Sequence, residues 1–158
     1  MQIRVFSATA SGPTPLAAFD RALQVGNAHD TNLIVLTSVV PAGATVIRAS
    51  AEPGEFPVGD RLYCVMAEQR ALEPGAEAWA GLAWATDTNG LGGLFVEAHG
   101  HSEHQVRFDL EQTLDAIISD RPYWHVGDKD LELAGTTCEG HPVCAMVMAI
   151  YESAAWNG

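Results

Sequence analysis

Apolar residues recur along the chain with two different spacings, and these spacings predict its secondary structure. Alternating or continuous apolar runs predict eight strands, at residues 2–9, 32–40, 45–48, 61–70, 77–86, 93–99, 130–137 and 143–152. The dipeptide Asn89-Gly90 separates two of them and is typical of a hairpin turn. Apolar residues three or four positions apart predict two helices, one between Pro15 and Gly26 and one over about 102–120.

Both predicted helices begin at a residue that can accept a hydrogen bond from the first turn. Thr14 is the expected N-cap of the first helix and Ser102 that of the second. The first helix should bury an apolar face made of Leu16, Phe19, Ala22 and Leu23. The second should bury a stripe made of Val106, Leu110, Leu114, Ile117 and Ile118.

The order of these elements predicts an α+β fold. One helix follows the first strand, another lies between two groups of strands, and no linker or repeat divides the chain. That order favours mixed or antiparallel sheets with the helices outside them. Several strands are apolar throughout, which indicates sheets covered on both faces. A chain of 158 residues is expected to form one domain with a core that needs no disulfides.

Composition narrows the possible partners and the compartment. The formal net charge is −12, which would repel a phosphate backbone and attract small cations, so nucleic acid is not expected as a partner. No apolar run approaches the roughly 20 residues of a membrane-spanning helix, and residues 1–6 lack the pattern of a signal peptide. Three cysteines cannot form a complete disulfide framework, which suits a reducing cytoplasm. A cytoplasmic protein without a membrane partner is therefore expected.

Three sites in the sequence carry candidate chemistry. Two adjacent hydroxyl residues, Thr37 and Ser38, lie inside the apolar run 32–40, where each hydroxyl must find a hydrogen-bond partner. Asp20 lies on the first predicted helix, and Glu97 ends the run 92–97 within the predicted strand 93–99. Taken singly, each has an ordinary interpretation, as a satisfied core hydroxyl or as an exposed carboxylate.

Taken together and in order, these segments resemble the pyruvoyl-dependent arginine decarboxylases. The resemblance covers nearly the whole chain and includes residues 18–23, 32–38, 62–67, 73–75, 80–85, 92–97 and 141–146. It implies a four-layer α/β/β/α sandwich, with two sheets face to face and a helix layer on each outside. It also implies a homotrimer of cleaved protomers, or a dimer of such trimers, with active sites between neighbours, so that Asp20 and Ser38 of one site come from different protomers.

The resemblance implies that the chain cuts itself between Thr37 and Ser38. The Ser38 hydroxyl would attack the Thr37 carbonyl, and the chain would separate into residues 1–37 and 38–158, with Ser38 converted into a pyruvoyl cofactor. Asn32 matches the family position that assists near this bond. Many members carry Ser-Ser at the cleavage point, whereas this chain carries Thr-Ser, a departure that affects only the residue that contributes its carbonyl.

The same resemblance implies a reaction and a substrate. A pyruvoyl carbonyl serves as an electron sink when an amino acid loses carbon dioxide. Glu97 matches the proton donor of the family, and its apolar neighbours Leu94, Phe95 and Val96 would keep its carboxyl protonated. Asp20 matches the residue that binds the substrate guanidinium, and a carboxylate pairs with that planar group through two hydrogen bonds. The expected reaction converts L-arginine, a small-molecule substrate, to agmatine.

Two alternatives remain open from the residues themselves. One is a decarboxylase for another basic amino acid, because the Asp20 carboxylate would select a positively charged substrate without fixing the length of its side chain. The other is an uncleaved, non-catalytic or metal-binding domain on the same fold. Its candidate ligands are His99, His101, His104, Cys138, His141 and Cys144. Because the sequence lacks a paired Cys-x-x-Cys and the first cluster falls at a strand end, no metal is expected.

Overall fold

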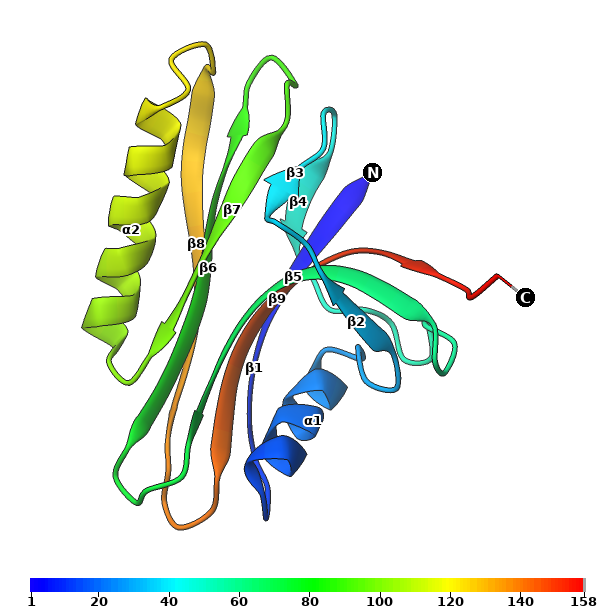
Figure 1. The fold of residues 1–158 in the computed structure, drawn as a ribbon, viewed down its shortest axis with the longest axis vertical. Coiled ribbons are helices and arrows are strands. Elements are labelled where there is room, and N and C mark those ends of the chain that lie inside the picture. The colour runs from blue at the N-terminus through cyan, green and yellow to red at the C-terminus, as the bar shows by residue number, and fades with distance from the viewer. Residues whose placement is uncertain (158) are drawn as a thin grey trace.

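The chain forms a sandwich of two sheets with one helix on each outer side (Figure 1). The computed structural model describes residues 1–157, and within these residues there are nine strands and two helices. Their bounds are β1 Gln2–Ser11, α1 Pro15–Val25, β2 Asn32–Val35, β3 Val39–Val40, β4 Thr45–Arg48, β5 Arg61–Ala71, β6 Glu77–Asp87, β7 Gly93–Gly100, α2 Glu103–Ser119, β8 Val126–Thr137 and β9 Val143–Ala154.

One sheet has five strands in the order β2-β5-β9-β1-β4, and the other has four in the order β3-β7-β6-β8. The first sheet is mixed, because its outer pairs β2–β5 and β1–β4 are parallel while β9 runs antiparallel to both of its neighbours. The second sheet is antiparallel throughout. The predicted α+β class and the four-layer α/β/β/α arrangement are therefore confirmed.

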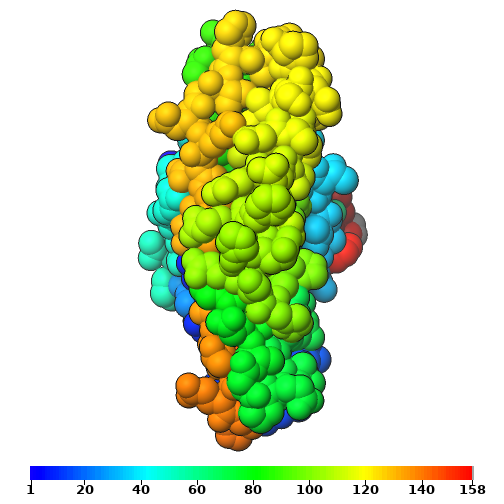
Figure 2. Space-filling model, turned by 90° about the vertical axis from the view of Figure 1, so that its left-hand side faces the viewer, coloured from blue at the N-terminus to red at the C-terminus, as the bar shows by residue number. Residues whose placement is uncertain are grey.

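Three apolar clusters fill the three spaces between the four layers. The largest lies between the sheets and includes Val65, Leu82 and Phe95. A second joins α1 to the outer face of the five-stranded sheet, and a third joins α2 to the outer face of the four-stranded sheet. Helix α2 runs along the long axis of the molecule and covers much of the face shown in Figure 2. In the described part of the chain, no helix is long and apolar enough to cross a membrane.

The predicted helix ends are confirmed. The Thr14 hydroxyl accepts a hydrogen bond from the Ala17 amide at 3.1 Å, and the Ser102 hydroxyl accepts one from the Gln105 amide at 3.4 Å.

The predicted apolar face of α1 is wrong at one position, because Leu16 is 65% exposed. The helix is turned so that the small residues Ala18 and Ala22 meet the sheet, since they allow the closest approach.

The predicted strand 32–40 is also wrong, because it divides into β2 and β3, which belong to different sheets. The Leu36 amide still donates to the Cys64 carbonyl of β5, at 2.8 Å. Two residues later, the Ser38 carbonyl accepts from the Phe95 amide of β7, at 2.8 Å. The chain turns between the two sheets at Ser38, which has a φ of 68° and so cannot continue a strand. The other predicted strands are confirmed, although β8 begins at Val126, earlier than expected.

Candidate active site

The crossing between the sheets brings Ser38 against Glu97. These residues are 59 positions apart in the sequence, and the Ser38 hydroxyl donates a hydrogen bond to the Glu97 carboxylate. Ser38 is half-buried, while the side chain of Glu97 on β7 is exposed. The Phe95 amide holds the Ser38 carbonyl from the same strand. The structure therefore places a hydroxyl, a carboxylate and the Thr37–Ser38 peptide bond together at one edge of the sandwich.

The backbone of Ser38 is strained. Its φ of 68° lies in the left-handed region, where a residue with a Cβ is disfavoured by about 1–2 kcal/mol. The conformation persists because the chain is held on both sides of it, by β5 through Leu36 and by β7 through the Ser38 carbonyl. This strain lies next to the peptide bond at which cleavage is expected, and no local sequence pattern predicted it.

Strand β3 is held close to β7 by a glycine. Gly92 has a φ of 118°, and a Cβ at this position would lie 2.6 Å from the Val40 carbonyl oxygen. A larger residue would therefore push β3, and Ser38 with it, away from β7. Val40 and Gly93 are direct cross-strand partners, so the position of this short strand depends on the glycine pair at the start of β7.

A tyrosine that the sequence did not single out completes the crossing. The Tyr151 hydroxyl donates to the Val39 carbonyl at 2.9 Å. Burial raises the pKa of Tyr151, and the nearby Glu97 carboxylate raises it further, so the phenol stays protonated as a donor. Tyr151 ends an apolar run, and an aromatic residue in such a run is typical of a buried core position. The neighbouring residues therefore do not predict its contact with Val39.

A cavity of about 450 Å³ lies beside the Thr37–Ser38 bond. Thr37 and Val39, on either side of Ser38, both line it, together with Tyr63 and Tyr151 from the five-stranded sheet. Its remaining lining residues are Met1, Leu36, Pro41 and Glu152.

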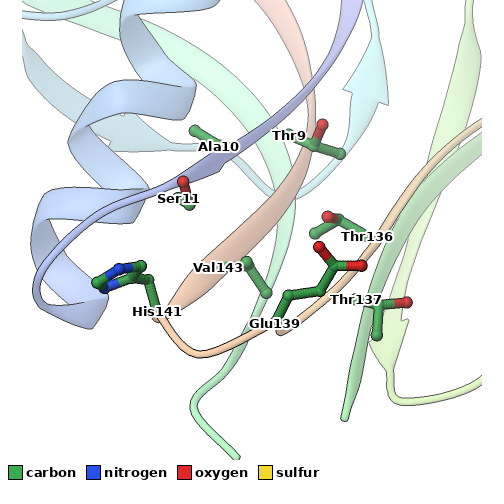
Figure 3. Close-up of a pocket in the computed structure, with 8 residues that line it drawn as sticks. All are labelled: Thr9, Ala10, Ser11, Thr136, Thr137, Glu139, His141 and Val143. Carbon is green, nitrogen blue, oxygen red and sulfur yellow. The ribbon is translucent and has the colours of Figure 1, made fainter. Parts of the chain in front are cut away.

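A second cavity, of about 440 Å³, opens at the other end of β1 between Thr9, Ser11, Thr136, Glu139 and His141 (Figure 3). The candidate metal ligand His141 lines this second cavity, whereas the residues predicted for the decarboxylase site do not.

Glu97 is not enclosed by apolar residues within one chain. Leu94 and Val96 are buried against α2, on the other face of the sheet, because successive residues of a strand point to opposite faces. Phe95 lies on the same face as Glu97 but packs in the core against Trp84 and Tyr151. In a single protomer, Leu94, Phe95 and Val96 therefore do not provide the apolar surroundings that the sequence predicted for the Glu97 carboxyl.

Asp20 does not meet Ser38 within one chain. It lies exposed on α1, where its carboxylate accepts a hydrogen bond from the Gln24 amide group at 2.7 Å. Helix α1 covers the outer face of the five-stranded sheet, whereas Tyr151 and Phe95, which adjoin Ser38, lie on the inner face. The sheet thus separates the two predicted residues of the same protomer.

Asn32 stands at the opposite end of β2 from the crossing. Its side-chain amide donates to the Gly59 carbonyl at 2.7 Å, and its backbone amide donates to the Asp60 carbonyl at 2.7 Å. An extended chain advances about 3.3 Å per residue, so β2 carries Asn32 well away from Ser38. Within one chain, Asn32 secures the turn before β5 and remains exposed.

The candidate metal ligands do not converge. Among the described residues, no group of three His, Cys, Asp or Glu side chains is arranged to hold a metal ion. The His99 ring donates through Nδ1 to the Gln69 side-chain carbonyl at 2.8 Å, and His101 donates through Nδ1 to the Glu77 carbonyl at 2.7 Å. Cys138 and Cys144 are buried in different core clusters.

Comparisons with known proteins agree on one family. A family model described as "Pyruvoyl-dependent arginine decarboxylase" matches residues 2–154. A relative of that name from Halobacterium salinarum is 43% identical, covering 95% of this chain and 93% of the relative. A relative of the same name from Pyrococcus furiosus is 32% identical, covering 92% of this chain and 91% of the relative. Another, from Thermococcus kodakarensis, is 29% identical, covering 91% of this chain and 90% of the relative.

Solved structures also resemble the chain, among them one that is only distantly similar. It is titled as a pyruvoyl-dependent histidine decarboxylase at pH 8 and has 19% sequence identity and a TM-score of 0.47, over 68% of this chain and 55% of that chain. A likeness this low bears on neither substrate nor mechanism.

Proposed function

Because this chain belongs to the pyruvoyl-dependent arginine decarboxylase family, we propose that it cuts itself between Thr37 and Ser38 and then converts L-arginine to agmatine and carbon dioxide. The observation that carries the proposal is the contact between the Ser38 hydroxyl and the Glu97 carboxylate at the strained crossing between the sheets. A nucleophile hydrogen-bonded to a base and adjacent to the bond that it attacks is the arrangement that nucleophilic catalysis requires.

The cleavage uses the residues at the crossing. Ser38 Oγ attacks the carbonyl carbon of Thr37 while its proton passes to Glu97, and the bond from Thr37 to the Ser38 nitrogen breaks, which leaves an ester. Loss of the Ser38 α-proton then expels the Thr37 carboxylate. Water finally replaces the nitrogen on residue 38 and releases ammonia. The net change consumes one water molecule and yields residues 1–37, residues 38–158 bearing a terminal pyruvoyl group, and ammonia.

The strain at Ser38 favours this conversion. The left-handed φ is costly because the Cβ of an L-residue crowds the backbone. Cleavage removes the peptide bond that defines this φ, and the Cα becomes a planar carbonyl carbon. Ser38 is thus the residue of the crossing whose strain is relieved by the reaction, which supports its assignment as the cofactor precursor.

The other predicted residues have roles that fit their chemistry. The pyruvoyl group, once formed, supplies the carbonyl that withdraws electrons as carbon dioxide leaves. Glu97, which contacts residue 38, delivers the proton that replaces the carboxylate on the substrate α-carbon. Asp20 binds the substrate guanidinium through a bidentate ion pair. Its carboxylate is exposed and therefore accessible to such a ligand.

The complete site forms between protomers of a homotrimer, or of a dimer of trimers. Asp20 and Asn32 lie away from Ser38 within one chain, so a neighbour must supply them. Three apolar side chains around the crossing are exposed in the single protomer, namely Ile34 at 36%, Val35 at 58% and Val39 at 63%. Apolar residues gathered beside an incomplete site support a docking surface there. A neighbour on this surface would also enclose Glu97.

A cytoplasmic location accompanies this function. Cys64, Cys138 and Cys144 are free and buried. Burial raises the pKa of Cys64 and that of Cys144 to about 12, which keeps both thiols protonated and unreactive. Free structural thiols suit a reducing compartment.

The experiment that tests the function combines intact mass with substrate assays. Denatured wild-type protein should give two masses that correspond to residues 1–37 and 38–158, with the larger lighter by one ammonia than hydrolysis predicts. A Ser38→Ala variant should remain one chain. The processed protein should decarboxylate arginine in preference to ornithine, lysine and histidine. A wild-type chain that stays intact would refute the cleavage, and a preference for another of these amino acids would correct the substrate alone.

A further inference from the structure

Tyr151 occupies an irregular position in β9. Along the pairing of β5 with β9, Tyr63 lies opposite Glu152, whereas the next residue, Cys64, lies opposite Ile150. Tyr151 is therefore the extra residue of a β-bulge. On the other side of β9, the pairing with β1 also ends at Ile150. Tyr151 nevertheless keeps the regular alternation of the strand, because Val147, Ala149 and Tyr151 all face the space between the sheets.

The Tyr151 side chain reaches from one sheet to the edge of the other. β9 is in the five-stranded sheet, while Val39, whose carbonyl accepts the Tyr151 hydrogen bond at 2.9 Å, is in β3 of the four-stranded sheet. Within residues 1–157, β3 forms the edge of that sheet and pairs with β7. Tyr151 is 8% exposed, and its ring packs on Phe95 with ring centroids 6.3 Å apart.

We propose that Tyr151 is a positioning residue for residue 38, both in the self-cleavage and in the mature enzyme. The inference rests on the proposed function, because it concerns the same reacting residue. Tyr151 would act through the Val39 carbonyl, and it would not itself exchange a proton with the substrate.

The two carbonyls that follow the scissile bond are fixed by different sheets. The Phe95 amide of β7 holds the Ser38 carbonyl at 2.8 Å, and the Tyr151 hydroxyl of β9 holds the Val39 carbonyl at 2.9 Å. Together they restrict rotation of the two peptide units immediately after Ser38. This restriction keeps the strained serine from relaxing to an extended conformation, which would turn its hydroxyl away from the Thr37 carbonyl.

The same contact gains importance after cleavage. In the intact chain, residue 38 is tethered on its other side through Leu36, whose amide donates to the Cys64 carbonyl at 2.8 Å. Cutting after Thr37 removes this tether and leaves residue 38 as a chain end. The hydrogen bonds from Phe95 and Tyr151 then hold the segment that bears the cofactor next to Glu97. A looser segment would bring the cofactor carbonyl to the substrate amine less often, which lowers kcat.

The test compares two tyrosines that line the same cavity. Tyr151→Phe removes the hydroxyl that reaches Val39, whereas Tyr63→Phe removes a hydroxyl from the same cavity and leaves the Tyr151–Val39 hydrogen bond in place. Freshly made protein would be sampled over time and scored by intact mass. We expect Tyr151→Phe to slow cleavage about tenfold, since the Val39 carbonyl loses the hydrogen bond that fixes the segment after Ser38. Tyr63→Phe should cleave at the wild-type rate.

Steady-state assays of the fully cleaved proteins separate positioning from general damage. Tyr151→Phe should lower kcat for arginine while KM stays near the wild-type value, because the contact orients the cofactor segment and not the substrate. Wild-type cleavage rate and kcat in Tyr151→Phe would overturn the inference. A wild-type protein that never cleaves would overturn the proposed function, and this inference with it, so the two failures are distinguishable.

A second variant tests the Tyr151 hydroxyl even if Tyr151→Phe fails to fold. Replacing Tyr151 with 3,5-difluorotyrosine keeps the ring and the hydroxyl but makes the phenol more acidic. As pH rises, the modified phenol should lose its proton first, and its cleavage rate should fall at a pH at which the wild-type rate does not. Parallel pH profiles for the two proteins would contradict the inference even if Tyr151→Phe proved unstable.

Discussion

Arg48 and Asp130 form a bidentate ion pair across one open edge of the sandwich. Arg48 Nη1 donates to Asp130 Oδ2 at 2.9 Å and Nη2 donates to Oδ1 at 2.5 Å, while Nε donates to Glu132 at 2.8 Å. The guanidinium also stacks over Trp84, 5.1 Å from the ring centroid. Arg48 belongs to β4 and Asp130 to β8, which are edge strands of the two sheets. The chain crosses between the sheets at the opposite edge, at Ser38. An ion pair therefore links the sheets at one edge, and the segment in which we propose the cleavage links them at the other.

Loss of this ion pair should weaken the sandwich modestly. The Arg48 and Asp130 side chains are 48% and 46% exposed, so solvent screens the pair. We expect Arg48→Gln to cost about 1 kcal/mol, or a fall in melting temperature of about 2–4 °C. Both proteins should carry Ser38→Ala, so that a single chain unfolds. Arg107→Gln, which removes an exposed pair with Glu103 on α2, is the matched control and should change the melting temperature less.

The pH dependence of this pair has a defined sign. Hydrogen bonds from Arg48 lower the pKa of Asp130 below its usual value. The stability that the pair contributes is therefore present above the usual pKa of an aspartate and is lost as pH falls through the lowered value. The difference between wild type and Arg48→Gln should narrow in acid and in high salt. A difference that grows in either condition would contradict this interpretation.

The strain at Ser38 can be measured directly by comparing two variants that cannot cleave. Ser38→Ala keeps a Cβ at a φ of 68°, whereas Ser38→Gly removes it and relieves the left-handed backbone. Glycine also gains freedom in the unfolded chain, which offsets part of the relief. We expect Ser38→Gly to be more stable by roughly 0.5–1 kcal/mol in denaturant unfolding. Glycine substitution at Thr37, the adjacent residue, should destabilise instead.

Local signals in the sequence predicted the elements well, because caps and turns depend on neighbouring residues. Thr14 and Ser102 cap their helices as expected, and Asn89-Gly90 lies in the hairpin between β6 and β7. The break at Ser38 could not be seen in this way, since Val39 and Val40 continue an apolar run. What divides the strand is its pairing with β5 on one side and β7 on the other, which depends on the whole fold.

The site was predictable only in part. Ser38 and Glu97 were identified by resemblance to a family, and the structure brings them together. Tyr151 was missed, because its contact with Val39 depends on how the two sheets pack against each other and leaves no mark in a short apolar sequence. Asp20 was predicted as a substrate ligand, and this role stays a prediction because one protomer does not bring it to Ser38.

Asp20 can be tested against an aspartate in a similar setting. Asp20 accepts a hydrogen bond from Gln24 on α1 at 2.7 Å, and Asp109 accepts one from Gln105 on α2 at 2.6 Å. Asp20→Asn should lower kcat/KM for arginine about 10- to 100-fold, mainly through KM, because an amide cannot form the bidentate ion pair. The cleavage rate should not change. Equal effects from Asp20→Asn and Asp109→Asn would remove Asp20 from the substrate site.

Asp87 organises the hairpin that leads into β7, and its contribution should depend on pH. Among the described residues it is the one charged side chain that is buried, at 5% exposure. Its carboxylate accepts from the backbone amides of His125 at 2.6 Å, Asn89 at 2.8 Å and Leu91 at 3.2 Å. Desolvation acts to raise the pKa of Asp87, but the three backbone hydrogen bonds outweigh it and lower the pKa.

The sign of the Asp87 effect follows from linkage. A lowered pKa in the folded state means that the carboxylate stabilises the fold above the usual pKa of an aspartate and stops doing so as pH falls through the lowered value. In the Ser38→Ala background, Asp87→Asn should therefore lower the melting temperature at neutral pH, with the gap closing in acid. Because Gly92 at the end of this hairpin abuts Val40 of β3, Asp87→Asn should also slow cleavage when Ser38 is present. A melting-temperature gap that is constant across this pH range would show that the carboxylate charge does not stabilise the hairpin.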